Sequence, residues 1–224
     1  MVFWVYFVLN NLRGTLLPAL EKVGKGFAAT GLSPNFWTVV GLVIALSSAV
    51  VYGMGVEFGL IIGGILLLVS GFFDMVDGQV ARVTGKTSKK GEYLDSMFDK
   101  ISEVAIFLGI LIGGYAEPYI VLLAITLSLL VSYARAKSDL INIKLQGIGI
   151  GERAERLLVI AIIGIIGFMD YAVVIVIIIA GITLIQRMVF TTKNIKDWST
   201  TFGMLWQKVV MLWGNTLSRN KIIS

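Results

Sequence analysis

Long apolar runs separated by short polar stretches dominate this chain. The runs fall at about 36–54, 58–73, 101–115, 118–134, 157–169 and 171–190. The second run continues into a polar segment after Phe73, and the third begins near Glu92, so both reach the roughly 20 residues that a helix needs to cross a bilayer. We therefore expect an all-α integral membrane protein with six transmembrane helices.

Basic residues lie on one side of these expected helices. The turns expected near 53–57, 114–118 and 168–171 contain Glu57, Glu117 and Asp170 but no Lys or Arg. All 19 basic residues fall on the opposite side, or on helix ends that face it. Because loops rich in Lys and Arg stay in the cytoplasm, we expect a multi-pass protein of the cell membrane with both termini, and the polar segment after Phe73, at the cytoplasmic face.

The ends of the chain differ from its six-helix core, expected over residues 34–190. Residues 1–33 are expected to form an interfacial segment, with an amphipathic helix over 10–33 that lies along the cytoplasmic surface. Ser33 before Pro34 is typical of a helix N-cap. Residues 191–224 form a tail in which three tryptophans suggest a second interfacial helix.

Composition narrows the chemistry. The chain is 57% hydrophobic and 15% charged, which is typical of a membrane protein. It has no cysteine and no histidine, so thiol nucleophiles, disulfides, Cys/His zinc sites and histidine bases are excluded. The net charge of +5 is explained by the cytoplasmic ends of the helices, and we expect the bilayer rather than nucleic acid as the partner.

Four aspartates stand out against this apolar background. Asp74 and Asp77 are three residues apart and Asp95 and Asp99 four apart, so each pair lies on one face of a helix. Antiparallel neighbouring helices joined by a loop at about 83–90 would bring all four together. Carboxylates this close need cations, and a set of hard oxygen ligands selects Mg²⁺, Mn²⁺ or Ca²⁺.

Small residues accompany the aspartates. Gly78 and Ala81 follow the first pair and Gly91 precedes the second, which leaves room beside a metal. Arg82 offers a planar group for a phosphate oxygen. This combination points to a bound pyrophosphate diester.

The pattern D-x-x-D-G-x-x-A-R-x8-G-x-x-x-D-x-x-x-D is similar at every fixed position to the signature of the CDP-alcohol phosphotransferases. The resemblance implies attack by an alcohol on the lipid-linked phosphate of a CDP-lipid, with release of CMP. It also implies two Mg²⁺ or Mn²⁺ ions held by the four aspartates, with Asp99 as the base, and a homodimer. The residues expected to bind the CDP-lipid are Asn35, Thr38, Asp74, Gly78, Ala81, Arg82, Ser88 and Gly91.

A second concentration of charge follows in the other half of the chain. Its pieces, among them Ala134-Arg135-Ala136 and Glu152–Leu157, resemble the phosphatidylinositol phosphate and archaetidylinositol phosphate synthases. This implies that inositol 1-phosphate is the acceptor. The residues expected to bind its phosphate are Arg135, Lys137, Arg153, Arg156 and Arg187. Tyr133 and Lys137 depart from the bacterial pattern, which has lysine and glutamate there.

Two alternatives remain open from the sequence. One is the same chemistry with glycerol 3-phosphate or another polar alcohol as the acceptor. The other is a divalent-cation or proton transporter that uses the aspartates. Transporters commonly show inverted repeats and discontinuous helices near the bilayer midplane, and we find neither in this sequence.

Overall fold

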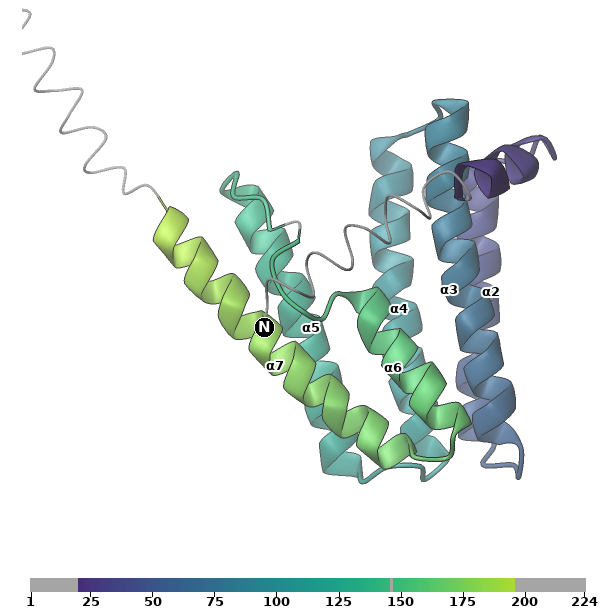
Figure 1. Ribbon diagram of the computed structural model, residues 1–224, viewed down its shortest axis with the longest axis vertical. Coiled ribbons are helices and arrows are strands. Elements are labelled where there is room, and N and C mark those ends of the chain that lie inside the picture. The colour runs from purple at the N-terminus through teal and green to yellow at the C-terminus, as the bar shows by residue number, and fades with distance from the viewer. Residues whose placement is uncertain (1–19, 146, 196–224) are drawn as a thin grey trace, which may run out of the picture.

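The computed structural model describes residues 20–145 and 147–195, and over these residues it is helical with no strand. The all-α class is therefore confirmed. Six helices follow one another along residues 34–194 (Figure 1). They are α2 (Pro34–Gly53), α3 (Gly59–Thr84), α4 (Lys89–Ile112), α5 (Pro118–Leu140), α6 (Arg153–Ile165) and α7 (Met169–Asn194).

Four of these helices, α2, α3, α5 and α7, are long and apolar enough to cross a membrane. The other two differ for distinct reasons. The first half of α4 carries charged residues, including both aspartates of the second pair. Helix α6 has only 13 residues. Length and composition thus support four of the six expected spans.

Local signals in the sequence explain where the helices begin and end. The Ser33 hydroxyl accepts a hydrogen bond from the Phe36 amide at 3.3 Å, so the expected N-cap of α2 is confirmed. Helix α3 runs through the first aspartate pair and ends at Gly85, whose φ of +65° favours glycine. Ser88 then caps α4 by accepting from the Gly91 amide at 3.0 Å. The connection is therefore residues 85–88, shorter than expected.

Helix α2 is the common neighbour of α3 and α4, which do not themselves pack closely against each other. Ser48 and Ser70 donate buried hydrogen bonds between α2 and α3, to the carbonyl oxygens of Gly63 and Gly41 at 2.7 and 2.9 Å. On the other side of α2, the missing side chain of Gly109 lets α4 approach the Ala49 backbone. Helices α3 and α4 are thus held apart by a shared partner.

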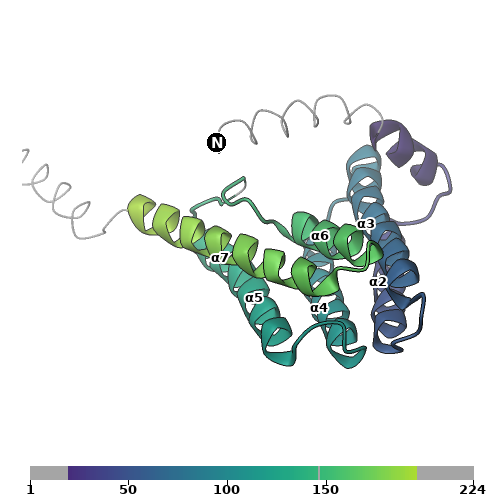
Figure 2. The same ribbon diagram turned by 60° about the horizontal axis from the view of Figure 1, so that its bottom comes forward.

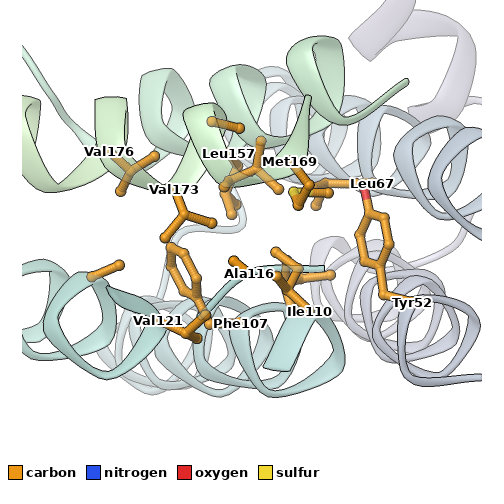
Figure 3. Packing of buried hydrophobic residues seen from close by; sticks show 14 of the residues in the cluster. Tyr52, Leu67, Phe107, Ile110, Ala116, Val121, Leu157, Met169, Val173 and Val176 are labelled. Carbon is orange, nitrogen blue, oxygen red and sulfur yellow. The ribbon is translucent and has the colours of Figure 1, made fainter. Parts of the chain in front are cut away.

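The apolar core joins all six helices at the end away from the α3–α4 connection. Tyr52, Leu67, Phe107, Leu157 and Val173 are among its members, one from each of five helices (Figure 3). Helix α6 packs against both α3 and α7, and α7 against α5 (Figure 2). The apolar core therefore occupies one end of the bundle, and the polar residues lie at the other end, next to the α3–α4 connection.

Residues 20–28 are also helical and lie near the beginning of α2 (purple in Figure 1). The Phe27 ring contacts Trp37, with centroids 4.8 Å apart, and Phe73. Glu21 and Lys25 are exposed and form an ion pair at 2.8 Å, so this short stretch has an apolar and a polar face. The rest of the helix expected over 10–33, and the tryptophan-containing tail, lie outside the described residues.

Candidate active site

Three of the four aspartates meet at the end of the bundle that lies next to the α3–α4 connection. Asp74 from α3 and Asp95 and Asp99 from α4 each place a carboxylate oxygen within 4.8 Å of the others. They are partly buried. Like charges this close require a cation, so the geometry suits a divalent metal.

Asp77 lies beside this cluster rather than within it. Its side chain is 6% exposed, and Oδ2 is buried with no hydrogen-bond partner among the described residues. A buried carboxylate oxygen without a donor is costly, and a bound cation would satisfy it. The unpartnered Asp77 oxygen and the three clustered carboxylates together fit the metal ions that the sequence implies.

A cavity of about 430 Å³ opens next to the carboxylates, between α2, α3, α4 and the 85–88 connection. Every expected CDP-lipid residue except Asp74 lines it, and Asp74 lines a smaller neighbouring cavity. Asp77 and Asp95 form its inner wall next to the carboxylate cluster. The cavity-lining residues are Pro34, Asn35, Thr38, Asp77, Gly78, Ala81, Arg82, Lys86, Thr87, Ser88, Lys89, Gly91, Glu92 and Asp95.

Glycine keeps this cavity open. A Cβ atom added at Gly78 would meet nothing within 4 Å, so the position faces empty space. At Gly91 the added atom would lie 3.0 Å from Asn35 Oδ1, so the α4 backbone runs close to the start of α2. A larger residue at Gly78 would extend into the cavity and reduce its volume.

Three basic side chains, Arg82, Lys86 and Lys89, line the same cavity and are exposed. Arg82 is among the residues expected from the sequence, whereas the two lysines are not. The sequence did contain a signal for them, because both lie between the two aspartate pairs, Lys86 in the connection and Lys89 at the start of α4. Their charge suits phosphate groups in a cavity that also borders the carboxylates.

Arg153, the first residue of α6, lies against the carboxylate cluster instead of standing apart from it. Its Nη1 is 3.1 Å from Asp74 Oδ1 and 2.5 Å from Asp99 Oδ1. Its Nη2 donates to Ser102 Oγ at 2.8 Å. Ser102 was not selected from the sequence, although it lies three residues after Asp99 on the same helix face. The guanidinium therefore joins α6 to both α3 and α4.

Arg156 and Arg187 bind protein groups, which differs from the expectation that they face an acceptor. Arg156 is 1% exposed, and its Nε and Nη2 donate to Glu103 Oε1 at 2.9 and 2.7 Å. Arg187 is 3% exposed and donates to the carbonyl oxygens of Ile148 and Val131. Both guanidinium groups also bind the segment that precedes α6, Arg156 through the Gly151 carbonyl and Arg187 through the Ile148 carbonyl.

Arg135 and Lys137 remain exposed near the end of α5. The Lys137 Nζ lies 5.7 Å from the centroid of the Tyr133 ring. Tyr133 and Lys137, the two positions that depart from the bacterial pattern, are therefore neighbours. The positive charge of Lys137 lies over the ring of Tyr133, which stands where bacterial members have a lysine.

Comparisons with known proteins agree with this arrangement. The family model of the CDP-alcohol phosphatidyltransferases matches residues 32–214. The chain is 35% identical to the archaetidylinositol phosphate synthase of Pyrococcus horikoshii over 84% of its own length and 99% of that protein.

Solved structures share the fold. Phosphatidylinositol phosphate synthase of Mycobacterium tuberculosis with CDP-DAG bound gives a TM-score of 0.67 at 24% identity, covering 77% of this chain and 92% of that one. The same enzyme in complex with manganese and citrate gives 0.68, covering 77% and 88%. Because the family model matches most of the chain, and the alignment with the Pyrococcus horikoshii protein covers nearly all of that protein, this chain belongs to the CDP-alcohol phosphatidyltransferase family of membrane enzymes.

Proposed function

We propose that this enzyme transfers the phospholipid moiety of a CDP-lipid, either CDP-diacylglycerol or CDP-archaeol, to inositol 1-phosphate and releases CMP. One observation carries the proposal: a cavity of about 430 Å³ joins a basic, glycine-containing wall to the aspartates. Its residues match the expected CDP-lipid set. The relatives are named archaetidylinositol phosphate synthase and phosphatidylinositol phosphate synthase, which supports the choice of acceptor.

The donor is proposed to bind with its nucleotide in this cavity. Arg82, Lys86 and Lys89 would bind oxygens of the diphosphate, and Gly78 and Ala81 would let it approach α3. Asn35 and Thr38, at the start of α2, would contact the cytidine. The lipid chains would extend from the cavity into the surrounding bilayer.

The four aspartates are proposed to hold two Mg²⁺ or Mn²⁺ ions. Bound divalent ions would neutralise the diphosphate and stabilise charge on the departing CMP. The Asp99 carboxylate accepts the proton of the acceptor hydroxyl. The hydroxyl oxygen then forms a bond to the lipid-linked phosphorus as the bond from that phosphorus to the CMP oxygen breaks, so the reaction needs no covalent enzyme intermediate.

The anionic acceptor is proposed to bind opposite the donor, near Arg135, Lys137 and Arg153. The first two are exposed, and Arg153 already reaches the carboxylates. Arg156 and Arg187 would contribute by holding the segment before α6, and a direct contact with the acceptor phosphate would require them to leave their present partners.

All six helices are proposed to lie within the bilayer. Helix α4 would cross with its charged half inside the site, and α6 would cross part of the bilayer. Both termini and the site would face the cytoplasm, as the basic residues favour. A homodimer stays a prediction, for which exposed apolar residues such as Ile101 and Leu122 offer contact area.

The test is an acceptor screen with the purified protein in detergent. CMP release from CDP-lipid should require Mg²⁺ or Mn²⁺, should stop with EDTA, and should be much faster with inositol 1-phosphate than with inositol or glycerol 3-phosphate. If CMP release were faster with glycerol 3-phosphate, the proposed reaction would stand but glycerol 3-phosphate would be the acceptor. No CMP release with any alcohol would refute the proposal.

A further inference from the structure

Arg153 occupies a position that a metal ion would also need. One nitrogen, Nη1, lies against both Asp74 Oδ1 and Asp99 Oδ1, at 3.1 and 2.5 Å. These carboxylates belong to different helices and are two of the three whose oxygens converge. The guanidinium thus supplies the positive charge that the crowded carboxylates need when no metal is bound.

The backbone that carries Arg153 is fixed from several sides. The Gly151 amide donates to Thr183 Oγ1 at 3.0 Å, and the Gly151 carbonyl accepts from Arg156 Nη1 at 2.8 Å. A Cβ atom at Gly151 would collide with Ile179, so the segment lies directly on α7. Arg156 and Gly151 thus anchor the start of α6, so a change in the contacts of Arg153 would involve its side chain rather than the backbone.

The present contacts of Arg153 are incomplete. Its side chain is 17% exposed, yet Nε is buried and has no hydrogen-bond partner among the described residues. A buried donor without an acceptor is unfavourable, which lowers the cost of moving the side chain elsewhere. By contrast, three nitrogens of Arg156 are engaged by Glu103 and Gly151.

We propose that Arg153 is an internal counterion that competes with the divalent metal for Asp74 and Asp99. When metal binds, the side chain leaves the two carboxylates while the α6 backbone stays in place. The released guanidinium then faces the acceptor side, where it binds an anionic group of the incoming alcohol. Metal binding therefore precedes formation of the complete acceptor site. This inference rests on the proposed metal site.

The test compares Arg153→Gln with the unaltered protein by Mn²⁺ titration, followed by electron paramagnetic resonance, in detergent without substrates. Loss of the competing cation should tighten Mn²⁺ binding by about tenfold or more. The same variant should unfold at a lower temperature in EDTA, because the carboxylates lose their counterion, and should gain more than the unaltered protein when Mn²⁺ is added.

Arg135→Gln is the matched control, because it removes one exposed positive charge nearby that forms no ion pair within the described residues. It should change Mn²⁺ affinity little. Equal tightening in both variants would overturn the inference, because it would show a general charge effect. Weaker or unchanged binding in Arg153→Gln would also overturn it, because Arg153 would then support the metal ligands or leave them unaffected.

Two further outcomes separate this inference from the proposed function. If the unaltered protein binds no Mn²⁺, both fail. If it binds Mn²⁺ and releases CMP but the variant does not bind more tightly, only the role of Arg153 fails. Should Arg153→Gln not fold, Arg153→Met also removes the competing charge and should bind Mn²⁺ more tightly than the unaltered protein. Equal or weaker binding by Arg153→Met would contradict the inference.

Discussion

At the scale of single residues, the cavity proposed for the donor includes a position without a side chain. A Cβ atom at Gly78 would face open space, and Ala81, one turn further on, also lines the cavity. Substituting a large apolar residue at Gly78 should therefore leave the helix packed while filling the volume proposed for the nucleotide.

We expect Gly78→Leu to raise the KM for CDP-lipid at least tenfold with little change in unfolding temperature. Gly71→Leu on the same helix is the matched control, because Gly71 also faces open space but does not line the cavity. Both substitutions replace a helical glycine, so their effects on helix propensity are equal. A similar KM in the two variants would show that the donor binds elsewhere.

Residue types and spacing predicted which residues of the candidate site lie close together, because helix geometry restricts where they can lie. The four aspartates, Gly78 and Arg82 follow from two helix faces and a short connection. The partners of the arginines could not be derived in that way. Whether Arg153 or Arg156 reaches the carboxylates depends on how α6 packs against α3, because the two positions lie only about 60° apart around the helix axis.

At the scale of elements, α4 and α6 are joined by a buried ion pair between Glu103 and Arg156. Both side chains are at most 2% exposed. Glu103 is the one acidic residue within the apolar half of α4, so its charge requires a partner there. The pair orients the start of α6, and with it the segment that precedes the helix.

Arg156→Met should lower the free energy of unfolding by about 3–5 kcal/mol, because Glu103 is left charged and buried without a partner. The double variant Arg156→Met with Glu103→Leu should recover most of this loss. Unfolding in detergent, followed by circular dichroism, measures both. An Arg156→Met variant of unchanged stability but with a raised KM for the acceptor would instead place Arg156 in the acceptor site.

The helix boundaries were predictable because local signals define them. Ser33 with Pro34 begins α2, and Gly85 and Ser88 bracket the connection between α3 and α4. Which helices pack against each other was harder to predict from the sequence. We expected α3 and α4 to pack against each other as consecutive helices, but Gly109 allows α2 to approach α4 closely, and α2 became the shared partner.

At the scale of the whole molecule, charge asymmetry gives a testable orientation. The turns after α2 and α4 contain Glu57 and Glu117, whereas the segment after α5 contains Lys144. All three residues are exposed. The positive-inside rule assigns the two glutamates to the outside and the lysine to the cytoplasm.

Because the chain has no cysteine, single-cysteine variants report each location without background. In intact cells, Glu57→Cys and Glu117→Cys should react with a membrane-impermeant maleimide, and Lys144→Cys should react only after lysis. Labelling of a detergent-solubilised sample controls for accessibility in each variant. Reaction of Lys144→Cys in intact cells would reverse the proposed orientation.

The shortness of α6 has a consequence for where the reaction occurs. Its 13 residues cover about 20 Å along the helix axis. The hydrocarbon layer is about 30 Å thick, so Arg153 and the carboxylates it contacts are expected roughly 10 Å below the membrane surface. At that depth a lipid can react with both of its tails still among their neighbours. Only the water-soluble substrate would then have to descend from the membrane surface.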